Sequence, residues 1–109
     1  MYKDWIPLPK QEEILNVNSI EKLKEFHNII NKNAEVLSNI IKNSMYKPNG
    51  EPNYEIGLEL ERKKEELLNR NIDVITAHEL YIKINLKEDE LSQIPTLIWF
   101  ANRLREIPI

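Results

Sequence analysis

The chain has 109 residues, of which 41% are apolar and 30% charged, and it carries a net charge of −3 and no cysteine. This length predicts one domain, spanning residues 1–109, that can bury a hydrophobic core without a disulfide or a structural metal. The absence of cysteine excludes disulfides and thiolate metal sites, and the charge balance argues against a basic surface that binds nucleic-acid phosphates.

The sequence predicts no targeting or membrane segment. Residues 1–15 are too polar for a signal peptide, and no window approaches the ~20 apolar residues of a transmembrane helix. We therefore expect a cytoplasmic protein. Isoleucine, asparagine and lysine make up 40 of the 109 residues, and their AT-rich codons indicate a low-GC genome. This composition, the short length and the lack of a catalytic motif are typical of accessory proteins of phages or mobile elements.

Residues 1–17 are predicted to form an extended arm. The segment Trp5–Pro9 (WIPLP) has alternate prolines, which fix φ near about −65° and push the preceding residues toward extended backbone. A short turn of helix around Gln11–Leu15 is compatible with the residues that follow.

A long helix is predicted over about residues 19–45. Asn18 is a suitable N-cap, with Glu21 three positions on as its capping-box partner. The apolar residues cover about half of the helical circumference, more than the ~100° stripe of an ordinary surface helix. We expect this helix to be the longest, and to be either central in a bundle or shared between the subunits of a homodimer. Its seam is Ile20, Leu23, His27, Ile30, Ala34, Leu37 and Ile41.

Residues 46–52 are the one clear break in the helical pattern, because Pro48, Asn49 and Gly50 favour a turn. We interpret this segment as an interhelical loop. Residues 53–70 then predict a second helix, whose apolar stripes are narrow and whose surface is rich in charge.

The stretch Ile72–Leu86 fits two structures. Thr76 and Glu79 form a capping box that would begin a helix, whereas the apolar residues that follow alternate with polar ones at the period of a strand. The helix is favoured, because the sequence contains no second strand candidate to pair with this one.

The last helix is predicted from about Ser92 to Glu106, with Pro95 in its first turn. Its apolar arc includes Ile98, Phe100 and Leu104. Trp99 falls outside this arc, on the side of Arg103. Together, the elements predict an all-α protein: a three- or four-helix bundle with one long central helix at about residues 19–45 and an extended N-terminal arm.

No residues form a catalytic, cofactor or metal site. With only two glycines, the chain lacks the loops that bind nucleotide phosphates. His27 and His78 lie too far apart in sequence for a local metal motif, so we expect His27 to pack in the helix seam and His78 to be exposed in a first helical turn. We therefore expect no enzyme activity and no cofactor. A solvated face is expected for the acidic residues Glu55, Glu59 and Glu66.

The function favoured by the sequence is that of a non-enzymatic protein-interaction module: an adaptor, an assembly factor or an inhibitor of another protein. Trp99 and Arg103, one turn apart, predict an aromatic–cation pair of residue types common at binding hot spots. Trp5 lies in an arm that resembles the extended segments that dock into partner grooves. Trp5, Trp99 and Arg103 are the candidate partner-binding residues. The structural alternative is that Trp99 packs on a neighbouring helix or the arm, and Trp5 on its own bundle.

The alternative function is a small dimeric regulator that binds nucleic acid. A helix-turn-helix is disfavoured, because the connector Lys87–Glu90 is net acidic and the last helix is too apolar to read a groove. The basic residues that this alternative would use are Arg103, Arg105, Lys22, Lys24 and Lys32.

Overall fold

The computed structural model describes residues 4–44, 46–86, 89, 94 and 96–106. Four helices lie within them: α1 (Gln11–Leu15), α2 (Ile20–Ser44), α3 (Tyr54–Asn85) and α4 (Leu97–Arg105). Apart from one isolated bridge between Tyr46 and Pro52, the described part of the chain forms no β-structure. The predicted all-α class is therefore confirmed. The molecule is elongated, with principal dimensions of 57 × 22 × 17 Å.

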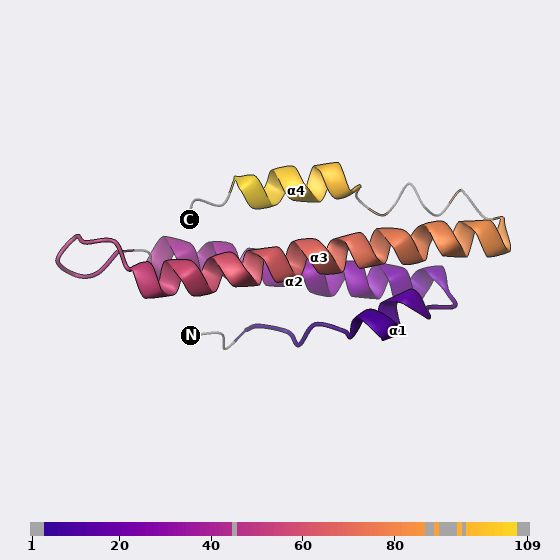
Figure 1. Ribbon diagram of the computed structural model, residues 1–109, viewed down its shortest axis with the longest axis horizontal. Coiled ribbons are helices and arrows are strands. Elements are labelled where there is room, and N and C mark those ends of the chain that lie inside the picture. Colours follow the sequence, from indigo (N-terminus) through magenta and orange to yellow (C-terminus); the bar gives the residue numbers. More distant parts are fainter. Residues whose placement is uncertain (1–3, 45, 87–88, 90–93, 95, 107–109) are drawn as a thin grey trace.

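α2 and α3 form an antiparallel hairpin that sets the long axis of the molecule (Figure 1). α3 contributes a narrow seam of fully buried side chains at seven-residue spacing, Leu60, Leu67 and Val74. α2 contributes a wider buried face, and the spacings in both helices are those of helices that pack side by side. The buried residues of α2 are Ile20, Leu23, Phe26, His27, Ile30, Asn33, Ala34, Leu37, Ile40 and Ile41.

α3 is the longest helix, with 32 residues against 25 in α2, so the expectation that α2 would be longest is wrong. The segments 53–70 and 72–86 belong to one continuous helix, because no glycine or proline interrupts residues 58–85. An ion pair between Arg70 and Asp73 (3.4 Å) spans the expected boundary between them. The helical interpretation of 72–86 is confirmed, and its capping-box residues lie inside α3 rather than at a helix start.

The loop 46–52 closes the hairpin through a compact turn. Lys47 N donates to Glu51 O (2.8 Å), Gly50 N donates to Lys47 O (2.9 Å), and Glu51 N donates to Asn49 Oδ1 (3.0 Å). Gly50 has a φ of +88°, a left-handed conformation that glycine adopts without a steric penalty. The segment interpreted as an interhelical loop therefore joins α2 to α3, and its turn residues act as their types predict.

The N-terminal arm and α1 lie along one side of the hairpin (Figure 1). Asn33 of α2 fastens the arm, because its Oδ1 accepts from Ile6 N (2.8 Å) and its Nδ2 donates to Ile6 O (2.7 Å). Asn33 is fully buried, so the arm satisfies both halves of its amide in place of water. Further along, Gln11 Nε2 of α1 donates to Asp73 Oδ1 of α3 (3.2 Å). Residues 5–10 form the extended part of the arm, and α1 is its short helical turn.

α4 lies on the other side of the hairpin (Figure 1). Its buried residues are Phe100 and Leu104, one turn apart. Thr96 caps the helix: its backbone is extended and its Oγ1 accepts from Trp99 N (3.2 Å). α4 therefore begins at Leu97, later than the sequence suggested. Ser92 and Pro95 themselves lie outside the described residues.

The wide apolar face of α2 is covered within one chain. α3 packs along it, and residues of the arm and of α4 complete the same hydrophobic core. The central position belongs to α3, which packs against α1, α2 and α4, so the expectation that α2 is the central helix is wrong. The homodimer stays a prediction, and the apolar face of α2 no longer supports it.

Replacing Asn33 with alanine should loosen the arm. Ile6 N–H and C=O would lose their buried partners, which costs about 1–3 kcal/mol in the free energy of unfolding. Urea denaturation measures this loss, and acrylamide quenching of tryptophan fluorescence reports the exposure of Trp5. The exposed Asn39 on the same helix provides the matched control, because Asn39→Ala should change stability by less than about 0.5 kcal/mol. Equal losses in the two variants would contradict a clamp at Asn33.

Candidate functional site

α4 carries Trp99 and Ile98 outside its buried face. Their exposed fractions are 44% and 74%, whereas Phe100 beside them is fully buried. Because Thr96 caps the helix through Trp99 N, the backbone that carries Trp99 is fixed at the first turn. Burial on one side and capping at the start thus hold two large apolar side chains in solvent.

Arg103 connects Trp99 to α2. Its guanidinium carbon lies 5.4 Å from the centre of the Trp99 ring, and its Nη2 lies 3.6 Å from Glu35 Oε1. The predicted aromatic–cation pair is therefore present. The ion pair is largely solvent-exposed, so it contributes at most about 1 kcal/mol to stability. Together, the two contacts link Trp99, through Arg103, to Glu35 of α2. We call Ile98, Trp99 and Arg103 the α4 surface.

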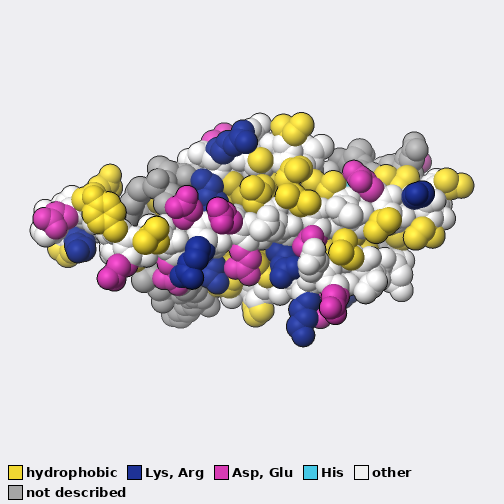
Figure 2. All heavy atoms as spheres, in the orientation of Figure 1, with side chains coloured by type: hydrophobic (Ala, Val, Ile, Leu, Met, Phe, Trp, Pro, Cys, Tyr) yellow, Lys and Arg dark blue, Asp and Glu magenta, His cyan; other side chains and the backbone are white. Residues whose placement is uncertain are grey.

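The surface around α4 combines an apolar region with a charged one. Figure 2 shows hydrophobic side chains gathered over α4 and the adjoining part of α3, and charged side chains of both signs along the first half of α3. On the α2 side of α4, Arg103 and Glu35 border a shallow depression. The sequence assigned Ile98 to the core arc of the last helix. The structure exposes it, because two residues of α4, Phe100 and Leu104, suffice to bury this short helix.

Trp5 lies elsewhere. Its ring is half-buried against the hydrophobic core, and Lys63 Nζ of α3 is 5.1 Å from the ring centre. The arm and α4 are on opposite sides of the hairpin (Figure 1), so the three candidate residues do not form one surface. Trp99 and Arg103 lie together, whereas Trp5 packs on its own bundle.

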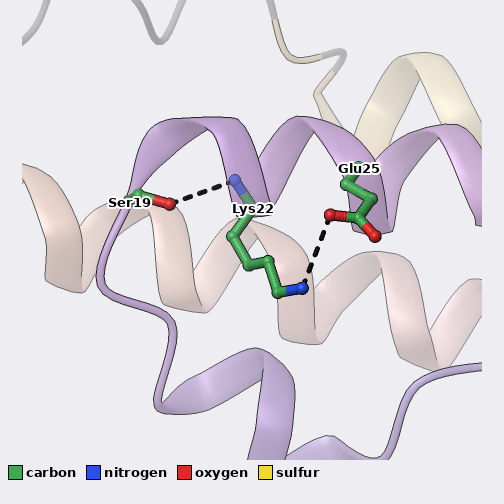
Figure 3. Close-up of polar contacts among 3 residues, drawn as sticks. All are labelled: Ser19, Lys22 and Glu25. Carbon is green, nitrogen blue, oxygen red and sulfur yellow. Dashed lines mark hydrogen bonds and ion pairs between the residues drawn. The ribbon is translucent and has the colours of Figure 1, made fainter.

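The basic residues of the alternative function are distributed over two helices and partly paired. Figure 3 shows Lys22 at the start of α2, where its N donates to Ser19 Oγ (3.3 Å) and its Nζ contacts Glu25 Oε2 (3.5 Å). Arg103 likewise contacts Glu35. Carboxylates next to two of the cations reduce the positive potential that phosphate binding needs. The described residues give no concentrated basic patch among Arg103, Arg105, Lys22, Lys24 and Lys32.

Buried polar side chains meet below α4. His27 of α2 is buried and contacts Phe100 of α4 in a T-shaped arrangement, with ring centres 6.2 Å apart and an angle of 69° between the planes. Asn71 of α3 is fully buried beside His27. Among the described residues, no hydrogen bond of normal geometry reaches His27 Nδ1 or either amide atom of Asn71. We call His27 and Asn71 the buried polar pair.

Burial lowers the pKa of His27, because a buried imidazolium loses its hydration. The polar contact with Asn71 opposes this shift, and the positive charge of Arg103 adds to it. His27 packs in the seam, as expected. Asn71 was not anticipated, although its place between the seam residues Leu67 and Val74 marks it as a polar residue on a buried face.

His78 does not lie in a first helical turn. It sits well inside α3 and is half-buried, so the expectation of an exposed residue is wrong. Burial lowers its pKa, and the neighbouring Glu79 carboxylate opposes the shift. The reason is the continuity of α3, which carries Thr76–Glu79 past the position where the sequence suggested a new helix.

The described residues contain no group of three histidine or acidic side chains that could hold a metal ion. Of the three acidic residues expected on a solvated face, Glu55 and Glu66 are exposed and Glu59 is half-buried. Glu66 contacts Lys63 Nζ (3.8 Å). Within the same part of the chain, no helix is long and apolar enough to cross a lipid bilayer. No protein-family model, curated protein or solved structure matches this chain.

We expect His27 to titrate below the ordinary histidine pKa of about 6.5. The unfolded chain then binds more protons than the folded one as the pH falls below this value, so the free energy of unfolding decreases there and is fully retained above it. NMR titration of the two histidine rings measures the pKa, and urea denaturation at about pH 7.5 and about pH 5.5 measures the stability. A His78→Gln variant assigns the signals. A His27 pKa at or above the ordinary value would contradict the effect of burial.

Proposed function

We propose that this protein is a non-enzymatic helical interaction module that binds another protein through the α4 surface. The observation that carries the proposal is the exposed Trp99, which Arg103 contacts from one side while Arg103 itself contacts Glu35 of α2. A large aromatic side chain fixed in solvent loses little conformational freedom on binding, which is what a binding hot spot requires.

The neighbouring residues support the same role. Ile98 adds exposed apolar area beside Trp99, and the hydrophobic side chains seen over α4 continue onto α3 (Figure 2). Arg103 supplies a cation at the border of this apolar area, on the side of the Glu35 carboxylate. An apolar centre with a polar border is the usual organisation of a protein–protein interface. An adaptor, an assembly factor or an inhibitor, encoded by a phage or mobile element and acting in the cytoplasm, fits this description.

Trp5 has a smaller part in this proposal than the sequence suggested. Its packing on the core and its contact with Lys63 favour a structural role in fixing the arm. Nucleic-acid binding receives no added support, since Lys22 and Arg103 each contact a carboxylate. We therefore propose Trp99 and Arg103 as the partner-binding residues.

Trp99→Ala should weaken partner binding by about 2 kcal/mol or more, a roughly 30-fold loss of affinity, while the free energy of unfolding changes little. The measurement is capture by the tagged protein from a nuclease-treated lysate of a low-GC bacterium, followed by titration with the purified partner. Tyr54→Ala is the matched control, because Tyr54 is an exposed aromatic residue at the start of α3 and is not part of the α4 surface.

Two outcomes would contradict the proposal. If Trp99→Ala unfolds the protein in a urea titration, the indole is a structural residue. If a stoichiometric partner binds Trp99→Ala and the unsubstituted protein equally, binding uses another surface. A mobility shift with nucleic acid that weakens steeply with added salt would instead favour the dimeric regulator.

A further inference from the structure

The buried polar pair lies where an apolar contact would be more stable. The side chains before and after His27 on the buried face of α2 are Leu23 and Ile30, and those around Asn71 on α3 are Leu67 and Val74. His27 Nδ1 and both amide atoms of Asn71 are buried with no hydrogen bond of normal geometry within the described residues. Each such atom costs free energy that water would relieve. The hairpin therefore carries a polar, titratable point within an otherwise apolar seam.

α4 covers the buried polar pair and has only a short buried face. It has nine residues, which is below the length at which an isolated helix is stable, so its structure depends on its contacts with the hairpin. Those contacts are the buried Phe100 and Leu104, together with the exposed ion pair of Arg103. Phe100 packs directly on the His27 ring. The attachment of α4 thus includes a contact with a titratable ring.

Burial is the main factor that disfavours a positive charge on His27, and the groups that face the ring act in opposite directions. From α3, the polar contact with Asn71 favours the charged form. From α4, Arg103 brings a second positive charge that disfavours it, and Arg103 itself contacts the Glu35 carboxylate. Departure of α4 would open the imidazole to water and remove the charge of Arg103 from it, so a protonated His27 favours the form without α4 in place.

We propose that protonation of His27 releases α4 from the hairpin, which gives the protein a docked form at neutral pH and a released form in mild acid. The proposal is independent of the proposed partner binding. Each unit by which the His27 pKa differs between the two forms changes the docking equilibrium about tenfold. We expect the α2–α3 hairpin to persist in both forms, because α2 and α3 form the most extensive helix–helix contact of the described residues.

The chain provides its own reporter. It has two tryptophans, so Trp5→Phe leaves Trp99 on α4 as the only one. We expect acrylamide quenching of Trp99 to increase as the pH falls from about 7.5 to about 5, across the range in which histidine titrates. The far-UV circular dichroism should lose little intensity, because α2 and α3 hold most of the helical residues. A parallel loss of most helical signal would mean global unfolding and would overturn the proposal.

The two histidines of the chain supply the matched variants. In the single-tryptophan background, His27→Gln should abolish the change in Trp99 quenching over this pH range, and His78→Gln should leave it in place. The proposal is overturned if quenching does not change with pH, if the change survives His27→Gln, or if His78→Gln removes it.

A measurement without substitutions covers the case in which His27→Gln does not fold. In the unsubstituted chain, NMR resonances of the His27 ring, the Phe100 ring and the Trp99 indole should shift with one common midpoint. Separate midpoints for His27 and for the two α4 residues would show that α4 does not respond to this proton, and the proposal would be wrong.

Discussion

The burial of two seams against each other, one on α2 and one on α3, is the interaction on which the rest of the structure depends. Leu23, Ile30 and Leu37 on the first and Leu60 and Leu67 on the second are fully buried. Each of these side chains contributes roughly 1.5–3 kcal/mol by leaving water. The arm, α1 and α4 are too short to fold alone, and each is ordered by the hairpin that this burial creates.

The sequence correctly predicted the elements that local signals specify: a regular apolar spacing along one helix, or residues that favour a turn. α2 was recognised because its seam is regular and wide, and the loop 46–52 because its residues specify a turn. α3 was divided in two, because its buried stripe is narrow and a capping box at Thr76–Glu79 imitates a helix start. Continuity of a helix is decided by tertiary contact as well as by local signals, and here the long partner α2 supplies that contact along most of its length. α4 starts later than expected because Thr96, whose backbone is extended, caps the helix through Trp99 N.

The candidate site was predictable where it is local. Trp99 and Arg103 are four positions apart on one helix, so their contact follows from helical spacing. Glu35 and Phe100 belong to partnerships between helices, and the hold of Asn33 on Ile6 joins residues 27 positions apart. Such contacts depend on how the elements pack, which spacing within one segment does not specify. For this reason the sequence made Trp5 and Trp99 equal candidates for partner binding, whereas in the structure Trp5 packs on the core and Trp99 is exposed.

The placement of the arm and α4 on opposite sides of the hairpin has a consequence for how this chain can change over generations (Figure 1). Substitutions at distant sites with no shared partners have additive effects on stability. Residues that hold the arm, such as Asn33, and residues that hold α4, such as Phe100, use different flanks of the same scaffold. Selection can therefore change residues on the α4 side, and with them the binding preferences of the α4 surface. The contacts on the arm side are unaffected by such changes, and their contribution to stability helps the protein to tolerate them.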